Sequence, residues 1–281
     1  KLDSGENFIS IESKICLDAV KNAGYVLENK HPKFLGDNLK TWNKDEVSLV
    51  TEADLLSEKE IISLIKKQDS KYIILSEEAT SSFQYPSSKQ FWAVDPLCGT
   101  VPFSAGLDSW GVSVAYISKS KKTSVGAIYC PASKELVYCD ENKVYKNEEE
   151  FFVNPKFPKI KNITLCLEIE RGENWTKLFK GQLDWVKHFS QINSFASAVY
   201  PGLQVINGKI PLMVIYKISL EHVASLLVIG QKLGLCATDI HGNDLDLDSF
   251  QDKIPEWFVF GWPEPHNELM NIIKKKIKKG N

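Results

Sequence analysis

The order of periodic segments is the feature that most restricts the fold of this chain. Apolar residues recur at helical spacing over residues 11–26, and the region of Pro32 ends that helix. A second helix is expected after Asp54, with Leu55, Ile61, Ile62 and Ile65 as its apolar set. Short β-like runs then follow, separated by turn-forming or charged residues: 72–75, 91–94, 111–117, 124–129 and 135–139. The first half therefore consists of helices followed by a meander of strands.

Strands and helices alternate in the second half. We expect strands at 163–167 and 211–216, and helices at 195–206, 221–233 and 264–279. This alternation is typical of a layered α/β unit, so the predicted fold class is α/β with α+β layers. Residues 143–161 lack strong periodicity, and two interpretations stay open. They join an N-terminal half, 1–153, to a smaller C-terminal half, 154–281, or they form a long surface loop within one domain of residues 1–281.

Size and charge exclude several classes of function. The chain has 281 residues, of which 43% are hydrophobic, so it is long enough to bury a substantial core. It carries 34 basic and 36 acidic residues, which leaves no overall positive field to attract nucleic acid or an anionic membrane. No run approaches the roughly 18 apolar residues of a membrane span. The lysines of residues 274–279 are interpreted as a solvated last helical turn that complements the helix dipole.

Cysteine and arginine usage adds two expectations. The six cysteines are scattered without a Cys-x-x-Cys pair, which favours reduced thiols and a cytoplasmic location. No signal-like segment is present, although a chain that begins at Lys1 leaves a removed upstream piece open. Arg171 is the only arginine, so any phosphate held here needs a metal ion, backbone amides or lysine.

Three acidic positions follow expected strands or begin an expected helix: Glu77-Glu78, Asp95 and Glu221. Carboxylates that are separated in sequence and converge in space are what a hard divalent cation such as Mg²⁺ requires. Pro96, Gly99 and Thr100 sharpen this interpretation, because a stiffened turn with a glycine lets backbone amides approach an anion closely. The alternative, an ordinary turn, has about equal weight from this short string alone.

Four motifs in order resemble the inositol monophosphatase-like family, which includes bisphosphate nucleotidases and is related to the fructose-1,6-bisphosphatases. They are Val50-Thr51-Glu52-Ala53-Asp54, Ser76-Glu77-Glu78, Trp92-Ala93-Val94-Asp95-Pro96-Leu97-Cys98-Gly99-Thr100, and Ser219-Leu220-Glu221-His222-Val223-Ala224-Ser225. Gly234 and residues 239–242 continue the likeness. The resemblance implies an αβαβα sandwich, a Mg²⁺-dependent phosphatase activity and a homodimer.

The resemblance also implies roles for individual residues. Glu77, Asp95 and the carbonyl of Leu97 would form a first Mg²⁺ site. Thr100, oriented by Asp54, would act with Glu77 to position and deprotonate the attacking water. The amides of Gly99 and Thr100 would hold the phosphate.

The second metal site of the family would use Asp95, the residue at Cys98 and the residue at Glu221, and here the pattern breaks twice. A thiol is a poor Mg²⁺ ligand, and Glu221 is one methylene longer than the usual aspartate. Mn²⁺ or Zn²⁺ held by Cys98, Asp95 and His222 is an alternative of lower weight. The sequence argues against a cysteine-based phosphatase, since Ser104 stands where that mechanism needs an arginine.

Substrate recognition departs from the inositol pattern as well. Val214 stands where inositol-specific members carry an acid, with Ile218 nearby, and Lys217 is a candidate substrate contact. Two functions follow from these residues. One is a metal-dependent phosphomonoesterase for a small phosphate ester such as an inositol, sugar or nucleotide phosphate. The other is a catalytically impaired member that binds a phosphate ligand or acts as a scaffold.

Overall fold

The structure, a computed structural model, describes residues 9–43, 48–78, 89–251 and 253–277. Its helices, in chain order, are α1 Ile11–Lys30, α2 Glu52–Gln68, α3 Thr100–Ser104, α4 Gly172–Leu178, α5 Val199–Ile206, α6 Leu220–Leu233 and α7 Pro263–Ile277. Among the described residues, no helix has the length and apolar composition that crossing a bilayer would need.

Within the described residues, the strands form two large sheets and one small hairpin. The first sheet runs in the order β3 Ile74–Ser76, β4 Phe91–Cys98, β5 Gly111–Ile117, β6 Val125–Cys130, β7 Glu135–Cys139, β8 Val144–Lys146 and β9 Glu149–Glu150. The second runs β11 Gln191–Asn193, β10 Thr164–Ile169, β12 Leu212–Tyr216, β14 Trp257–Gly261 and β13 Cys236–Thr238. The hairpin pairs β1 Thr41–Asn43 with β2 Leu49–Thr51.

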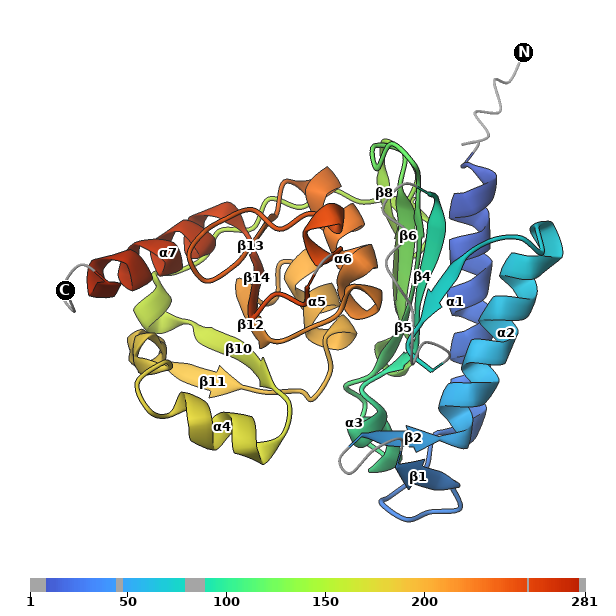
Figure 1. The fold of residues 1–281 in the computed structure, drawn as a ribbon, viewed down its shortest axis with the longest axis horizontal. Coiled ribbons are helices and arrows are strands. Elements are labelled where there is room, and N and C mark those ends of the chain that lie inside the picture. Colours follow the sequence, from blue (N-terminus) through green and yellow to red (C-terminus); the bar gives the residue numbers. More distant parts are fainter. Residues whose placement is uncertain (1–8, 44–47, 79–88, 252, 278–281) are drawn as a thin grey trace.

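The elements stack in five layers, which confirms the predicted αβαβα sandwich (Figure 1). Helices α1 and α2 cover one face of the first sheet, and α5 and α6 lie between the two sheets. A continuous core includes Phe91 and Val114 of the first sheet, Leu226 of α6, and Phe258 and Met213 of the second. A separate apolar cluster on the outer face of the second sheet packs against α4 and α7. Burying both faces of both sheets is what makes the sandwich stable.

Most of the expected elements are present, and three expectations need correction. Leu55 does not lie on the core-facing side of α2, because its side chain is exposed while Ile61 and Ile65 are fully buried. Residues 144–146 and 149–150 are regular despite their weak periodicity, since they pair as β8 and β9 and extend the first sheet. The chain crosses from the first sheet to the second over the residues that follow.

Helix α5 begins at Val199, later than the expected 195. The backbone amides of Phe195 and Ala196 donate instead to the buried Glu168 carboxylate, at 2.7 and 2.9 Å. Ala196 has a φ of 52°, which is incompatible with a right-handed helix at that position. A side chain from a neighbouring strand therefore holds the segment in a loop up to the start of the helix.

Candidate active site

The carboxyl ends of β3 and β4 place two of the candidate acids side by side. The two strands are parallel neighbours, with Ser76 opposite Val94, so Glu77 and Asp95 follow at the same edge of the sheet. The pairing of β4 with β5 then shifts register between Asp95 and Cys98. This irregularity turns the Pro96-Leu97 segment out of the ladder and lets the Leu97 carbonyl accept a 3.3 Å hydrogen bond from Thr100 Oγ1.

The buried Asp54 and the half-buried Thr100 form a polar pair next to this loop. Thr51 caps α2 and donates its backbone amide to Asp54 Oδ2 at 2.8 Å, so the cap fixes the orientation of the carboxylate. Thr100 Oγ1 donates to the other oxygen, Asp54 Oδ1, at 2.9 Å. Burial raises the pKa of Asp54, although the hydrogen bonds from Thr51 and Thr100 oppose the change.

Gly99 connects β4 to the short helix α3. Its φ of +96° lies in the left-handed region, and a Cβ there would come within 2.8 Å of the Ser109 carbonyl oxygen and 3.1 Å of Ser197 Cβ. Both the conformation and the close packing therefore require glycine. Its carbonyl accepts the Phe103 amide at 2.9 Å, which closes the first turn of α3.

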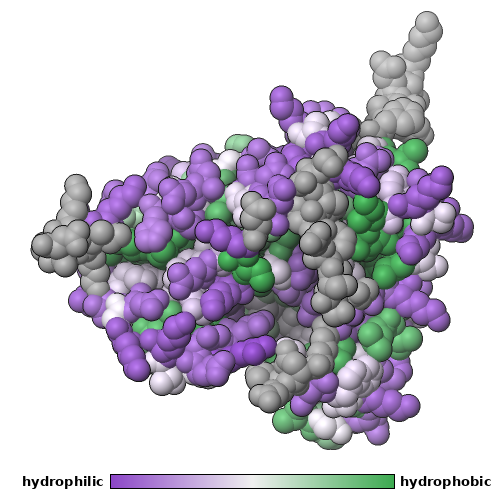
Figure 2. Space-filling view, viewed as in Figure 1, coloured by the Kyte–Doolittle hydropathy of each residue, from purple (hydrophilic) through white to green (hydrophobic). Residues whose placement is uncertain are grey.

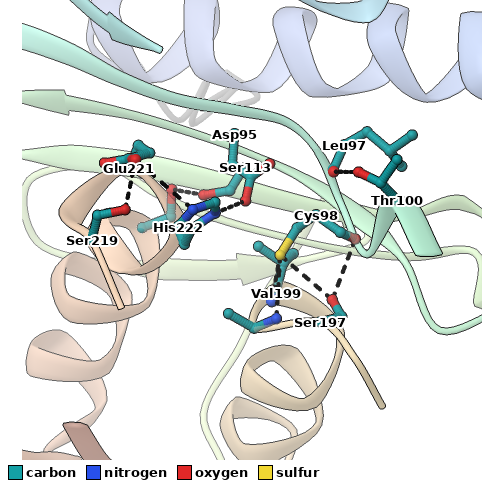
Figure 3. Close-up of polar contacts among 12 residues, drawn as sticks. Asp95, Leu97, Cys98, Thr100, Ser113, Ser197, Val199, Ser219, Glu221 and His222 are labelled. Atoms are coloured by element: carbon teal, nitrogen blue, oxygen red, sulfur yellow. Dashed lines mark hydrogen bonds and ion pairs between the residues drawn. The ribbon is translucent and has the colours of Figure 1, made fainter. Parts of the chain in front are cut away.

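Cys98 points away from Thr100, toward the beginning of α5 (Figure 3). Its sulfur is buried and accepts hydrogen bonds from the amides of Ala198 and Val199, at 3.2 and 3.3 Å, and from Ser197 Oγ at 3.5 Å. Burial, followed by the charge of Asp95, raises the pKa of the Cys98 thiol to about 11. None of these α5 contacts was expected from the sequence.

Asp95 faces a histidine. His222 Nδ1 lies 2.5 Å from Asp95 Oδ2, while Asp95 Oδ1 is buried and has no hydrogen-bond partner among the described residues. Burial lowers the pKa of His222, but the neighbouring Asp95 carboxylate outweighs it and holds that pKa well above its ordinary value. Glu221 accepts a 2.6 Å hydrogen bond from Ser219 Oγ, and its Oε1 lies 3.8 Å from His222 Nε2 (Figure 3).

A cavity of about 450 Å³ opens beside these residues. Figure 2 shows a hollow on this face between the part that carries α4 and the part that carries α3. Glu77, Leu97, Cys98, Gly99, Thr100 and His222 line one side of the cavity, and Glu168, Arg171, Ile215, Tyr216, Lys217 and Ile218 line the other. Asp54 lies beneath the wall, in contact with Thr100, and Glu221 is not among the lining residues.

The opposite wall differs from the sequence-based expectation. Val214 is fully buried in the cluster on the outer face of the second sheet, so Ile215, the next residue, lines the cavity in its place. Lys217 lines the cavity, with its ammonium 5.2 Å from the Tyr216 ring centre. Glu168 and Arg171 were not identified as site residues, although both lie at the carboxyl end of a strand, a position that could have indicated them.

Comparison with known proteins decides the family. The sequence profile of the inositol monophosphatase family matches residues 12–269. The chain belongs to the inositol monophosphatase family. A Thermotoga maritima protein described as fructose-1,6-bisphosphatase/inositol-1-monophosphatase is 24% identical over 242 residues, which is 85% of this chain and 86% of that protein. Nus factor SuhB of Haemophilus influenzae is 34% identical over 122 residues, 43% of this chain and 44% of that protein.

A solved structure of the same family shares the fold. Extragenic suppressor protein suhB from Bartonella henselae superposes with a TM-score of 0.78 at 22% identity, covering 95% of this chain and 99% of that chain. The resemblance in the four motifs is thus accompanied by the same architecture over nearly the whole length.

The first metal position of the family suits a hard divalent ion in this chain. Its ligand types, the Glu77 and Asp95 carboxylates and the Leu97 carbonyl, are all oxygens, as Mg²⁺ prefers. Asp95 Oδ1, buried and without a hydrogen-bond partner in the described part of the chain, is the kind of atom that a cation satisfies. The second position does not suit Mg²⁺, because a thiol stands at Cys98 and Glu221 is turned toward Ser219.

Proposed function

We propose that this chain is a metal-dependent phosphomonoesterase that hydrolyses a small phosphate ester in the 450 Å³ cavity. The observation that carries the proposal is the 2.9 Å hydrogen bond that Thr100 Oγ1, on the cavity wall, donates to Oδ1 of the buried Asp54. An inositol, sugar or nucleotide phosphate is small enough to enter a cavity of this volume.

Glu77, Asp95 and the Leu97 carbonyl would hold a divalent ion, with Mg²⁺ as the expected one. When bound, that ion stabilises negative charge on the phosphoryl group and makes a coordinated water more acidic. Thr100 already donates its own proton to Asp54, so its lone pairs can accept a proton from a water molecule placed between Thr100 and Glu77. The raised pKa of Asp54 favours onward transfer of a proton from Thr100.

The remaining steps involve the loop and the solvent. The water oxygen forms a bond to phosphorus, and the ester oxygen leaves with the electron pair of the broken P–O bond and takes a proton from solvent. The amides of Gly99 and Thr100 would bind the phosphate oxygens, because the left-handed conformation of Gly99 exposes the beginning of α3 to the cavity. Lys217, on the opposite wall, is the proposed contact for the rest of the substrate.

The test is phosphate release from a panel of inositol, sugar and nucleotide monophosphates by the purified chain with Mg²⁺. Thr100→Val should lower kcat by about 100-fold or more, because the proton acceptor is lost, and Thr100→Ser should keep most of it. Glu77→Gln should abolish turnover. Thr176→Val, which removes an exposed hydroxyl from α4, is the matched control and should leave kcat unchanged. Equal activity of Thr100→Val and the unmodified chain would refute the proposal.

A second candidate is a phosphate-binding or scaffolding protein with little catalysis. The contact of His222 with Asp95 favours it, since it occupies one oxygen of a carboxylate that catalysis needs. This candidate predicts that inorganic phosphate binds, as measured by calorimetry, while no ester of the panel is hydrolysed with Mg²⁺, Mn²⁺ or Zn²⁺. Turnover that Glu77→Gln abolishes would exclude it.

A further inference from the structure

Three side chains of different chemistry converge at the family's second metal position. Asp95, Cys98 and His222 each offer one ligand atom, and these atoms all lie within 4.8 Å of one another. Asp95 and Cys98 come from the end of β4, and His222 comes from the beginning of α6, so the fold rather than local sequence brings them together (Figure 3). Asp95 is fully buried and Cys98 is 5% exposed.

Their donor atoms are a carboxylate oxygen, a sulfur and an imidazole nitrogen. This set is suited to Zn²⁺ and similar borderline ions, whereas Mg²⁺ requires six oxygens in near-ideal octahedral geometry. Ligand atoms bonded to one tetrahedral Zn²⁺ at about 2.0–2.3 Å lie about 3.3–3.8 Å apart. The three ligand atoms lie within 4.8 Å of one another, and His222 Nδ1 and Asp95 Oδ2 are 2.5 Å apart, so binding an ion requires that this pair separate and that the sulfur approach.

Each of the three side chains has further features of a metal ligand. Asp95 Oδ1 is buried without a hydrogen-bond partner among the described residues, so this carboxylate has an oxygen to offer in addition to the one beside His222. The Cys98 sulfur faces the amides of Ala198 and Val199 at the N-terminal end of α5, and such donors offset the negative charge of a metal-bound thiolate.

The histidine is supported from its other side. His222 Nδ1 faces Asp95, and His222 Nε2 lies 3.8 Å from the Glu221 carboxylate, which Ser219 holds through a 2.6 Å hydrogen bond. A carboxylate behind the distal nitrogen is the usual arrangement around a metal-binding histidine, because it fixes the orientation of the ring. Glu221 lies next to His222 at this distance, so we give it a role in orienting the ring.

We infer that the second metal position of this chain binds a Zn²⁺-class ion through Asp95, Cys98 and His222, with the fourth coordination place open to the cavity. Both Cys98 and His222 line that cavity, so the open place is accessible to water or to a phosphate oxygen. The inference concerns metal identity alone and holds whether or not the chain hydrolyses an ester.

The test uses the full chain, stripped of metal with a chelator and titrated with Co²⁺, Zn²⁺ or Mg²⁺. Co²⁺ should produce the near-ultraviolet absorption of a thiolate–cobalt bond, and Zn²⁺ should displace Co²⁺ where excess Mg²⁺ does not. Cys98→Ser should abolish that absorption and weaken Zn²⁺ binding by about 100-fold, and His222→Ala should weaken it by about 10-fold or more. Cys236→Ser, at a partly exposed thiol outside the cluster, is the matched control and should change neither.

Cys98→Asp is a second variant at the same position, for the case that Cys98→Ser does not fold. It places a carboxylate oxygen where the sulfur stands, which is the ligand type that Mg²⁺ prefers. It should lower the preference for Zn²⁺ over Mg²⁺ by about 100-fold while circular dichroism stays that of the unmodified chain. Absence of the thiolate–cobalt absorption in the unmodified chain would show that the three residues form a hydrogen-bonded cluster only. The same conclusion would follow from an absorption that Cys98→Ser leaves intact.

Discussion

Gly99 allows the geometry of the phosphate loop to be tested at one residue. Gly99→Ala should destabilise the chain by about 2–4 kcal/mol, because a Cβ adds left-handed strain and meets the Ser109 carbonyl at 2.8 Å. Two controls separate these causes by urea denaturation. Gly181 has a φ of +106° with open space around it, so Gly181→Ala should cost about 1 kcal/mol from strain alone. Gly172→Ala has neither feature and should change stability by less than about 0.5 kcal/mol. Equal losses of unfolding free energy in Gly99→Ala and Gly181→Ala would show that the close approach of the Ser109 carbonyl to residue 99 contributes nothing.

The candidate site was predictable from the sequence where its residues lie in short motifs. The Thr51 cap orients Asp54, Glu77 follows β3, and Asp95 lies near the end of the adjacent parallel strand β4. Local patterns drew attention to Glu77 and Asp95, the family resemblance to Asp54, and the roles of all three stay predictions. The choice between Glu221 and His222 was not predictable. Successive residues of a helix point about 100° apart, and only the packing of α6 against β4 decides that His222 faces the cluster.

At the scale of elements, strands with clear boundaries were predicted and the start of α5 was not. β5 and β7 match the expected residues, because apolar runs bounded by turns locate such strands. Residues 195–198 precede the apolar α5, yet they remain outside the helix, because Glu168 accepts the amides of Phe195 and Ala196 and the Cys98 sulfur accepts that of Ala198. The Glu168 carboxylate is 27 residues from Phe195 in the sequence, so the residues around the helix start carry no sign that this acceptor competes for their amides.

Glu168 therefore holds the segment that leads into α5. Its Oε1 accepts the Phe195 amide, and its Oε2 accepts the Ala196 amide and the Ser194 hydroxyl at 3.0 Å. Glu168→Gln replaces one of these acceptors with a donor, so we expect a loss of about 1–3 kcal/mol and faster hydrogen exchange at Val199. Glu149→Gln, on the exposed strand β9, is the control and should change neither measurement. Unchanged exchange in Glu168→Gln would contradict this role.

At the scale of the whole molecule, polar contacts connect the middle helical layer, which contains α5, to the sheets on either side of it. Trp262 Nε1, at the end of the second sheet, donates to the Val205 carbonyl of α5 at 2.7 Å. Glu135 of β7 accepts from Gln204 of α5 at 2.9 Å and from Lys209 Nζ at 2.7 Å. The layered α/β class was predictable from the pattern of segments and the order of layers from the family resemblance, but these contacts were not, because they depend on the register between distant layers.

Glu135 makes part of this connection sensitive to pH. Burial by itself raises the pKa of Glu135, but hydrogen bonds from Lys209 and Gln204 outweigh it and lower the pKa to about 2. A carboxylate with a depressed pKa stabilises the fold fully above its unfolded value, about 4.3, and the contribution is lost as pH falls toward 2. A shift of this size corresponds to about 3 kcal/mol, which solvent screening of the 59% exposed Lys209 reduces to about 1–2 kcal/mol.

The difference in unfolding free energy between the unmodified chain and Glu135→Gln, measured in urea, should therefore be constant from pH 7 to pH 5 and shrink steadily below pH 4. Glu149→Gln should show no such difference at any pH. A gap for Glu135→Gln that persists unchanged at pH 3 would show that its packing, and not its charge, stabilises the contact between layers.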